Sequence, residues 1–291
     1  MVKNKLIKNA KKIDQFLISF LKKQKKSLLI QPMKYGVISG GKKIRSTIVL
    51  DTGKMFNISE KKLLNICAAI ECIHSYSLIH DDLPCMDDDK TRRGKPSTHI
   101  KFGEANAVLA GNSLLTLGFE MISGNDFIVN SKIKNLLIKE LAFCAGHSGI
   151  AGGQELDLRY EKKSISLNKV IEMQRKKTGK LFNFCCYAPT LLANKKKSEL
   201  KLMSKFGEDI GLLFQITDDL LDRKGKKKKI GKSTGKDKKK GKSTLISLLG
   251  VNNTIKFAKE LRIKILRKLK KHGKKANELE KTINFVFERN F

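Results

Sequence analysis

Apolar residues recur at helical spacing along several stretches of this chain, and no segment sustains the strict alternation of apolar and polar residues that marks a strand. Residues 59–79 contain neither glycine nor proline, and their apolar positions fall three and four residues apart. The pattern predicts a helix there, with Asn57 and Glu60 as its N-terminal cap. Further helices are predicted at about 104–121, 199–222 and 254–271.

The second of these helices carries Gly111 and Gly118, seven residues apart and therefore on one face, where they would let another helix approach closely. The chain has 291 residues, 40% of them hydrophobic, which is enough for one large core. We therefore expect an all-α fold: a large single-domain bundle of about ten or more helices spanning residues 1–291. In such bundles the functional site is a central cavity lined by inward-facing side chains.

Two further features indicate a soluble protein of the cytoplasm. The first residues lack the apolar core of a signal peptide, and the longest apolar runs are shorter than the roughly 20 residues of a membrane span. The six cysteines show no CxxC spacing and no orderly disulfide framework, which indicates a reducing compartment. We expect no stable membrane association.

The net charge of +33 raises nucleic acid as a partner. Basic residues cluster only at 223–242, however, and this stretch has no aromatic residues to stack on bases. We therefore interpret the excess lysine as spread over exposed faces, and expect no nucleic-acid partner. The stretch 223–242 is predicted to be a solvated loop. It contains GKST twice, but the preceding glycines enclose five residues, not the four of a P-loop, so that motif is excluded.

Five carboxylates crowd into residues 81–89 at the end of the first apolar helix. Such mutual repulsion is found either in a solvated acidic turn or in a site that binds cations. Asp81 and Asp87 are six residues apart and would point in different directions on an ideal helix. Pro84 removes one backbone donor, so we expect the helix to end or bend there and Asp87 to swing back toward Asp81.

A second acidic cluster favours the cation site over the solvated turn. Asp218 and Asp222 stand one helical turn apart at the end of another apolar helix, on the same stripe as Gln215. Two acidic stripes facing each other would hold hard divalent cations, and Mg²⁺ completes its shell with water and substrate phosphate oxygens. The pattern therefore predicts a magnesium site for a diphosphate substrate.

Several cations accompany the acids in the sequence and could bind diphosphate groups. Arginine is the more informative type in a chain this rich in lysine, because its planar guanidinium makes bidentate phosphate contacts that lysine cannot. The candidates are Lys42, Lys43, Arg45, Arg92, Arg93, Lys177, Lys232 and Lys242.

With these motifs in order, the chain resembles the trans-polyprenyl diphosphate synthases, in particular the bacterial farnesyl and geranylgeranyl enzymes, along nearly its whole length. The resemblance is carried by GGKKIR, His74, the DDxxxxD motif, RRGKPSTH, KFGEANAVLAGNSLL, GGQELDL, KTGKLF and FQITDDLLD. It implies the isoprenoid synthase fold. Three positions depart from the family pattern: Ser46 replaces a usual proline, Lys90 replaces a frequent aspartate, and residues 223–242 are unusually basic.

The resemblance also implies roles for individual residues. The diphosphate of isopentenyl diphosphate would be bound by Lys42, Arg45, His74 and Arg93. The allylic substrate would be bound by Arg92, Lys177, Thr178, Gln215, Lys232 and Lys242, the last two within a lid formed by residues 223–242. The metal-binding and catalytic acids would be Asp81, Asp87 and Asp218, supported by Asp82 and Asp222. Lys177 would also act in catalysis.

The implied activity is a cytoplasmic, homodimeric prenyltransferase of isoprene biosynthesis, with about three Mg²⁺ ions when substrate is bound. Isopentenyl diphosphate would add to dimethylallyl and then geranyl diphosphate, giving farnesyl diphosphate. Tyr76, five residues before Asp81, would set this product length, although periodicity alone selects Ser77. The alternatives are a geranylgeranyl diphosphate synthase, a class I terpene cyclase, which would lack the second aspartate cluster, and a basic nucleic-acid-binding or non-catalytic subunit.

Overall fold

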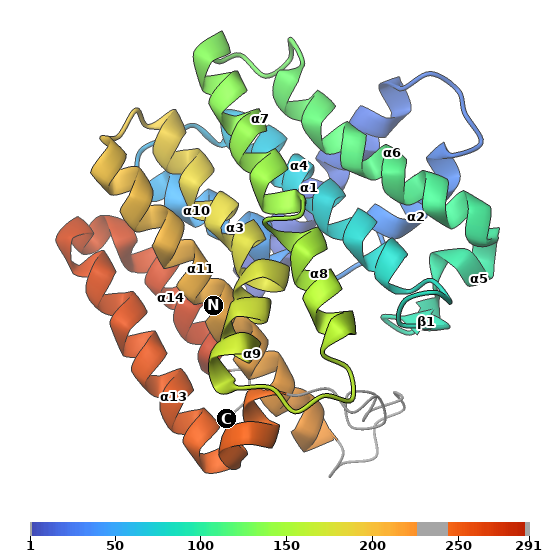
Figure 1. Ribbon diagram of the computed structural model, residues 1–291. Coiled ribbons are helices and arrows are strands. Elements are labelled where there is room, and N and C mark those ends of the chain that lie inside the picture. The colour runs from blue at the N-terminus through green and yellow to red at the C-terminus, as the bar shows by residue number, and fades with distance from the viewer. Residues whose placement is uncertain (1, 226–243, 289–291) are drawn as a thin grey trace. The chain divides into compact units, whose positions relative to one another are not determined.

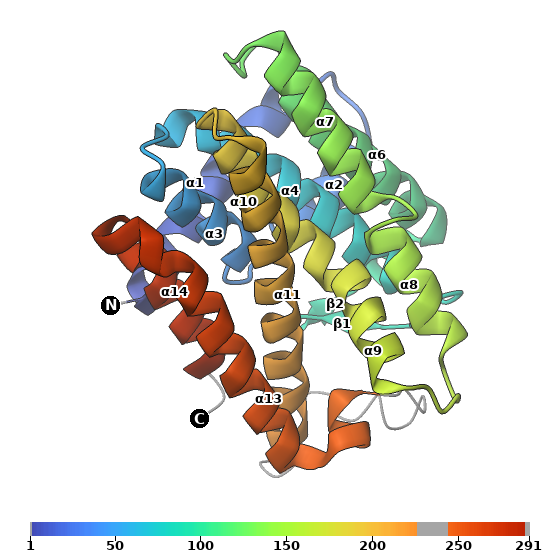
Figure 2. The same cartoon turned by 60° about the vertical axis from the view of Figure 1, so that its left-hand side comes forward.

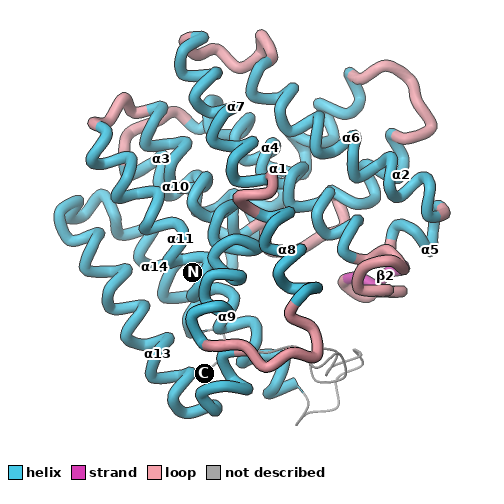
Figure 3. The backbone as a smooth tube through the Cα atoms, viewed as in Figure 1, coloured by secondary structure: helices cyan, strands magenta, loops and turns pink. Residues whose placement is uncertain are grey.

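The computed structural model describes residues 2–225 and 244–288, and these are almost entirely helical (Figure 1). Strand structure among them is confined to one small hairpin, drawn in magenta in Figure 3. The all-α prediction is therefore confirmed. Two compact units make up the chain: Met1–Leu141 with Leu191–Ala193 (unit 1), and Ala142–Thr190 with Asn194–Phe291 (unit 2).

Unit 1 is built around helix α4, Glu60–Asp81, which is buried over most of its length. Helix α6, Glu104–Ser123, packs along it, and the two lie side by side in Figures 1 and 2. A Cβ atom on Gly118 would lie 3.2 Å from the carbonyl oxygen of Ala69, and one on Gly111 would lie 2.2 Å from the ring of His80. The predicted close approach at these two glycines is thus confirmed. The other elements of the unit are α1 (Val2–Lys23), α2 (Ile30–Val37), α3 (Ile44–Met55), β1 (Thr91–Arg92), β2 (Lys95–Pro96), α5 (Thr98–Phe102), α6 (Glu104–Ser123) and most of α7 (Ser131–Ala145).

The predicted N-terminal cap of α4 is wrong. Ser59 is the N-cap residue, and Asn57 instead terminates the preceding helix α3 with a left-handed φ of 59°. The N–H of Ile58 donates to the carbonyl of Gly53 (2.9 Å) and that of Asn57 to the carbonyl of Lys54 (3.1 Å). This is the Schellman arrangement, in which asparagine is a common left-handed residue.

By length and composition, α4 is the single helix among the described residues that could cross a membrane. Within its most apolar window, however, 72% of the residues are buried inside the protein, as expected for a core helix. Glu71 on the same helix is buried and hydrogen-bonded to Ser46, which is a protein-interior arrangement.

Unit 2 is organised by the 29-residue helix α11, Lys197–Gly225, which lies beside α13, Leu245–Leu269, in both ribbon views (Figures 1 and 2). A Cβ atom on Gly211 would lie 2.6 Å from the Cα of Gly179, so α11 meets the η1 turn backbone to backbone. The elements of the unit are the end of α7, α8 (Ile150–Arg159), α9 (Leu167–Gln174), η1 (Arg175–Gly179), α10 (Lys180–Leu192), α11, α13 (Leu245–Leu269), η2 (Lys270–Ala276) and α14 (Asn277–Glu288).

The predicted loop at 223–242 overlaps the described residues only at its start, where α11 continues to Gly225. The rest of it, with Lys232 and Lys242, lies outside the described residues. The lid stays a prediction.

Candidate active site

The first acidic cluster forms a compact turn at the C-terminus of α4. The helix ends at Asp81, and the chain turns back so that the N–H of Asp87 donates to the carbonyl of Asp81 (2.8 Å). Asp88 adopts a left-handed φ of 50°, and the N–H of Asp89 donates to the carbonyl of Asp82 (3.1 Å). The predicted return of Asp87 to Asp81 is confirmed, and we call residues 81–89 the acid turn.

Asp82 and Arg92 form an ion pair beside the acid turn. The side chain of Asp82 is 3% exposed, and Nε of Arg92 donates to both of its carboxylate oxygens, at 2.8 and 2.9 Å. Burial raises the pKa of Asp82, and the Arg92 guanidinium opposes that rise. Arg92 also lies 3.7 Å from a carboxylate oxygen of Asp89. The observed partner of Asp82 is therefore Arg92, and its direct contact with a metal stays a prediction.

Arg93 lies in the turn between β1 and β2, and its side chain packs against the glycine loop that leads into α3. Its guanidinium donates to the carbonyl of Gly40 and to the hydroxyl of Ser39 (3.2 Å). A Cβ atom on Gly41, whose φ is 102°, would lie 2.7 Å from the guanidinium carbon. Glycine is therefore needed here for its backbone conformation, and its lack of a side chain lets the Arg93 guanidinium lie close. Lys42, the next residue, is exposed.

Arg45 and His74 are brought together between α3 and α4. A guanidinium nitrogen of Arg45 lies 3.1 Å from Nε2 of His74, so the neutral ring accepts a hydrogen bond there. Burial lowers the pKa of His74 well below its ordinary value, and the charges of Arg45, Arg93, Lys43 and Arg92 lower it further. Three predicted ligands of one diphosphate, Arg45, His74 and Arg93, thus share one neighbourhood.

Lys43 does not fit its predicted role as a diphosphate ligand. Its side chain is 3% exposed, donates to the carbonyl of Val37 (2.8 Å), and lies 3.4 Å from the carboxylates of both Asp14 and Glu71. Ser46, the residue that replaces a usual proline, donates to Glu71 at 2.7 Å. Lys43 is therefore a buried structural cation that holds the start of α3 against α1 and α4.

Tyr76, the predicted determinant of product length, is buried on α4 with 9% exposure. Its ring packs edge-on against His80 at 5.6 Å between centroids. Burial raises the pKa of Tyr76, and the nearby charge of Asp81 adds to the rise. The phenol therefore stays neutral and contributes bulk one turn below the acid turn. Its effect on product length stays a prediction.

In unit 2 the predicted substrate residues Lys177 and Thr178 lie on η1, a π-helical turn. Lys177 donates to the carboxylate of Asp157 on α8 (2.7 Å), and Thr178 donates to the side chain of Gln215 on α11 (3.1 Å). A Cβ atom on Gly153 would lie 2.1 Å from the backbone nitrogen of Lys177. The close approach of α8 thus places Asp157 beside Lys177.

The second acidic cluster is partly buried. The amide of Gln215 donates to Asp219 (2.9 Å), which is 9% exposed, whereas Asp218 is half-buried and Asp222 is exposed. The sequence predicts Gln215 on the stripe of Asp218 and Asp222, and the hydrogen bond that its amide donates within this cluster goes to Asp219. That the two acidic clusters face each other stays a prediction.

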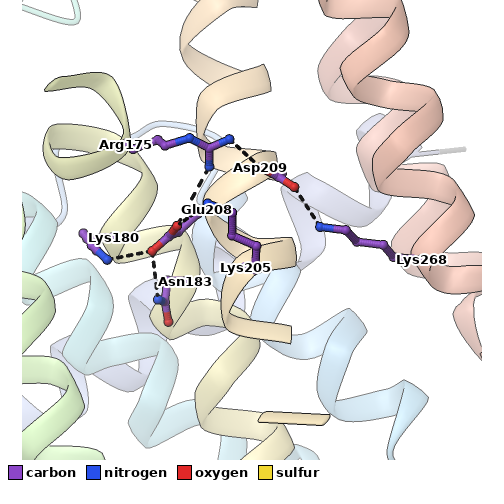
Figure 4. Close-up of polar contacts among 7 residues, drawn as sticks. All are labelled: Arg175, Lys180, Asn183, Lys205, Glu208, Asp209 and Lys268. Carbon is purple, nitrogen blue, oxygen red and sulfur yellow. Dashed lines mark hydrogen bonds and ion pairs between the residues drawn. The ribbon is translucent and has the colours of Figure 1, made fainter. Parts of the chain in front are cut away.

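A further group of charged residues in unit 2 escaped the sequence analysis. Glu208 and Asp209 on α11 bind cations from three other segments, as Figure 4 shows. Adjacent acids on an amphipathic helix are typical of a solvated face, and Arg175 and Asp209 are 34 residues apart. No local spacing signals such a contact.

The donor chemistry of the acid turn fits magnesium. Within 2–225 and 244–288, no three side chains of the His, Cys, Asp or Glu type are arranged to hold a metal by themselves. Mg²⁺ usually takes only one or two carboxylates and shares its other positions with water and phosphate oxygens. Asp81 and Asp87, joined through their backbones, are oxygen donors of the required kind.

Comparison with known proteins places this geometry in a family. The sequence profile described as "Polyprenyl synthetase" matches residues 26–286, nearly the whole chain and both units. The chain belongs to the polyprenyl synthetase family. A curated relative, the farnesyl diphosphate synthase of Escherichia coli (strain K12), is 42% identical over 267 residues, covering 90% of this chain and 89% of the relative.

Solved polyprenyl synthetase structures have the same fold. The apo structure of an FPP/GFPP synthase from Zymomonas mobilis matches with a TM-score of 0.88 and 35% identity, covering 98% of both chains. A geranyltransferase from Helicobacter pylori, complexed with magnesium and isoprenyl diphosphate, matches with a TM-score of 0.82 and 30% identity, covering 99% of this chain and 96% of that one. The predicted isoprenoid synthase fold is confirmed.

Proposed function

We propose that this polyprenyl synthetase is a prenyltransferase that condenses isopentenyl diphosphate with dimethylallyl and then geranyl diphosphate, releasing diphosphate and giving farnesyl diphosphate. The acid turn is the observation that carries the proposal, because a turn that returns Asp87 to Asp81 collects carboxylates for a magnesium–diphosphate complex. The similarity to the E. coli farnesyl diphosphate synthase supports the choice of substrates.

Each substrate would be bound by its own set of residues. Lys42, Arg45, His74 and Arg93 bind the diphosphate of isopentenyl diphosphate, and three of these already lie together in unit 1. Neutral His74 accepts a hydrogen bond from Arg45 and thereby orients its guanidinium. The allylic diphosphate is bound by Arg92, Lys177, Thr178, Gln215, Lys232 and Lys242.

Magnesium, when bound, neutralises charge on the departing diphosphate. Asp81, Asp87 and Asp218 would hold it, with Asp82 and Asp222 in support. The use of magnesium is supported by the H. pylori relative, whose structure contains magnesium and isoprenyl diphosphate. In the reaction the allylic C–O bond breaks, the alkene of isopentenyl diphosphate forms the new C–C bond, and a proton is lost to the departing diphosphate.

The chain's own side chains would supply the rest of the catalysis. Lys177, held at 2.7 Å by Asp157, places a cation where charge develops on the leaving group, and Thr178 lies next to it on η1 with its hydroxyl donating to Gln215. The buried ring of Tyr76 contributes apolar bulk below the acid turn and thereby limits the growing prenyl chain.

The purified protein with isopentenyl diphosphate, Mg²⁺ and either dimethylallyl, geranyl or farnesyl diphosphate tests the function directly. We expect farnesyl diphosphate from the first two allylic substrates and little reaction with the third. Geranylgeranyl diphosphate as the main product would overturn the product assignment, and no condensation at all would overturn the function.

We further propose that the two units form one polyprenyl synthase domain acting as a cytoplasmic homodimer. The family match across both units supports the first part. Exposed apolar side chains on α6, Val108 and Leu109, offer a surface for a second copy of the chain. Light scattering on the purified protein tests the dimer.

A further inference from the structure

The η1 turn, Arg175–Gly179, is a π-helical interruption between α9 and α10. Such turns are rare, hold one residue more per turn than an α-helix, and concentrate at functional sites. This one carries Lys177 and Thr178. Because an α-helical continuation would rotate both side chains away from their present directions, contacts that hold η1 in its π conformation also aim Lys177 and Thr178.

Asp209 on α11 binds the first residue of this turn. Its side chain is 0% exposed and accepts from Arg175 (2.7 Å) and from Lys268 on α13 (2.8 Å), as drawn in Figure 4. Burial alone would raise the pKa of Asp209, but the hydrogen bonds from Lys268 and Arg175 outweigh it and lower the pKa, so the group is charged. A buried charge of this kind needs a cationic partner.

Glu208, the neighbouring residue, binds the other end of the turn. It accepts from Lys180 (2.7 Å), the residue that follows η1, and from Asn183 on α10 (3.4 Å). Lys205 lies 3.3 Å from its second oxygen. Two adjacent acids of α11 therefore hold the first residue of the π turn and the residue that follows it, and Glu208 also lies 3.9 Å from Arg175 (Figure 4).

Helix α11 also packs directly against the η1 turn. Glu208, Gly211 and Gln215 follow at spacings of three and four, so they lie on one face of α11. The backbone of Gly179 packs closely against Gly211, and the side chain of Gln215 accepts a hydrogen bond from the hydroxyl of Thr178. Glu208 and Asp209 thus fix the register in which η1 lies along α11.

We propose that Asp209 is a positioning residue for the allylic diphosphate: by holding Arg175 on α11 it keeps the π turn in the register that presents Lys177 and Thr178 to the substrate. The proposal rests on the proposed function, in which these two residues bind the allylic substrate. Asp209 acts through η1 and does not touch the substrate.

A purely structural ion pair would have a different effect, and the chain provides a matched control. Glu199 lies on the same helix and pairs with Lys271 and His272 of η2, without contact to η1. Glu199→Gln therefore removes an acidic anchor of α11 and leaves the turn intact. Both Glu199→Gln and Asp209→Asn should lower the melting temperature.

Binding of an unreactive analogue separates positioning from stability. The probe is a thio analogue of geranyl diphosphate, titrated calorimetrically with Mg²⁺, alongside the KM for isopentenyl diphosphate. We expect Asp209→Asn to weaken the analogue's binding about tenfold, which corresponds to the loss of one well-aligned charged hydrogen bond between η1 and the diphosphate. The KM for isopentenyl diphosphate should stay within about twofold of wild type. Glu199→Gln should leave both values unchanged.

Two further variants keep the test decisive if Asp209→Asn does not fold. Lys268→Met removes one partner of Asp209 but leaves Arg175 attached, so analogue binding should stay within about twofold of wild type. Arg175→Met releases the turn and should weaken binding about tenfold. Equal effects of these two variants would overturn the proposal.

A double variant tests whether Asp209 acts through η1. In a Lys177→Ala background, Asp209→Asn should weaken analogue binding by less than about threefold, because part of its effect is already lost. Full additivity, or unchanged binding in the single variant despite a lower melting temperature, would show a structural role only. Failure of the wild-type enzyme to condense the substrates would refute the proposed function instead, so the two failures are distinct.

Discussion

At the scale of single residues, neighbours decide what a charged side chain does. Lys42 and Lys43 are adjacent and identical in type, yet Lys42 is exposed and Lys43 is buried between Asp14 and Glu71. Lys43 has a left-handed φ of 45° at the N-cap of α3, and its side chain donates to the carbonyl of Val37. Exposure therefore identifies Lys42 as the lysine of this loop that is accessible to a substrate.

His74 should make the native state sensitive to acid. Its pKa is lowered in the native state, so below about pH 6.5 the unfolded chain binds more protons and stability falls as pH falls. The loss is at most about 1.4 kcal/mol per pH unit. Urea unfolding of wild type and His74→Gln between pH 7 and pH 5 checks this. The wild type should lose more stability, and parallel profiles would contradict a neutral His74 ring in the native state.

The acidic residues should divide sharply by role. Asp81→Ala and Asp218→Ala should each lower kcat by about 100-fold or more, because each removes a metal ligand that acts in the ionising step. Asp88→Asn is the matched control, since Asp88 is exposed in the acid turn and its left-handed φ suits asparagine. Steady-state kinetics at saturating Mg²⁺ measure all three. Near-normal turnover in Asp81→Ala or Asp218→Ala would refute the two-cluster mechanism.

Tyr76 should set the length of the product. Tyr76→Ala removes a buried ring and should shift products toward geranylgeranyl diphosphate or longer without abolishing condensation, because close-packed interiors do not refill such a volume. Ser77→Ala is the control and should keep the farnesyl product. Chromatography of the products distinguishes the two variants. An unchanged product from Tyr76→Ala would show that another residue limits the length of the prenyl chain.

At the scale of elements, the two key turns differ in how far sequence could predict them. The acid turn was predictable because Pro84 and the crowded carboxylates are local signals, and the return of Asp87 to Asp81 follows from them. The π turn at η1 was not, because its cause is distributed over α8 and α11. Gly153, Gly211 and Asp209 lie far from it in sequence and meet it only in the folded unit.

The packing of α8 against η1 should be intolerant of a single methyl group. Gly153→Ala would place a Cβ 2.1 Å from the Lys177 nitrogen, so η1 must shift, at a cost of about 1–3 kcal/mol and with loss of activity. Gly146→Ala, where the nearest atom is the Ala142 carbonyl oxygen at 3.0 Å, should be milder. Thermal unfolding and kinetics of both variants test this. Equal, small effects would contradict the tight contact.

At the scale of the whole molecule, the fold was predictable from the sequence. Which of the many lysines form ion pairs inside the fold was not. Helical periodicity and the ordered motifs indicated an all-α synthase, and the structure and family match agree. Net charge gives no location, so it could not separate buried Lys43 or half-buried Lys268 from solvated lysines. Those two bind carboxylates contributed by other elements, which only tertiary structure brings near.

The charge of +33 should produce only weak, salt-sensitive binding to nucleic acid. Retention on immobilised duplex DNA should be lost between about 50 and 200 mM salt, whereas condensation activity should change little over that range. Both measurements use the same protein preparation. DNA retention that survives high salt, with catalysis absent, would favour the nucleic-acid-binding alternative.

The cysteines make the acid turn addressable by chemical labelling. Of the six, Cys67, Cys72, Cys144, Cys185 and Cys186 are buried, and burial raises the pKa of Cys72 from 9.0 to about 12, which suppresses the reactive thiolate. Cys85 alone is exposed, and it lies between Asp81 and Asp87. A maleimide dye would therefore attach to the natural sequence at one position, Cys85. Its emission would report the binding of diphosphate substrates and the release of products at the acid turn in real time.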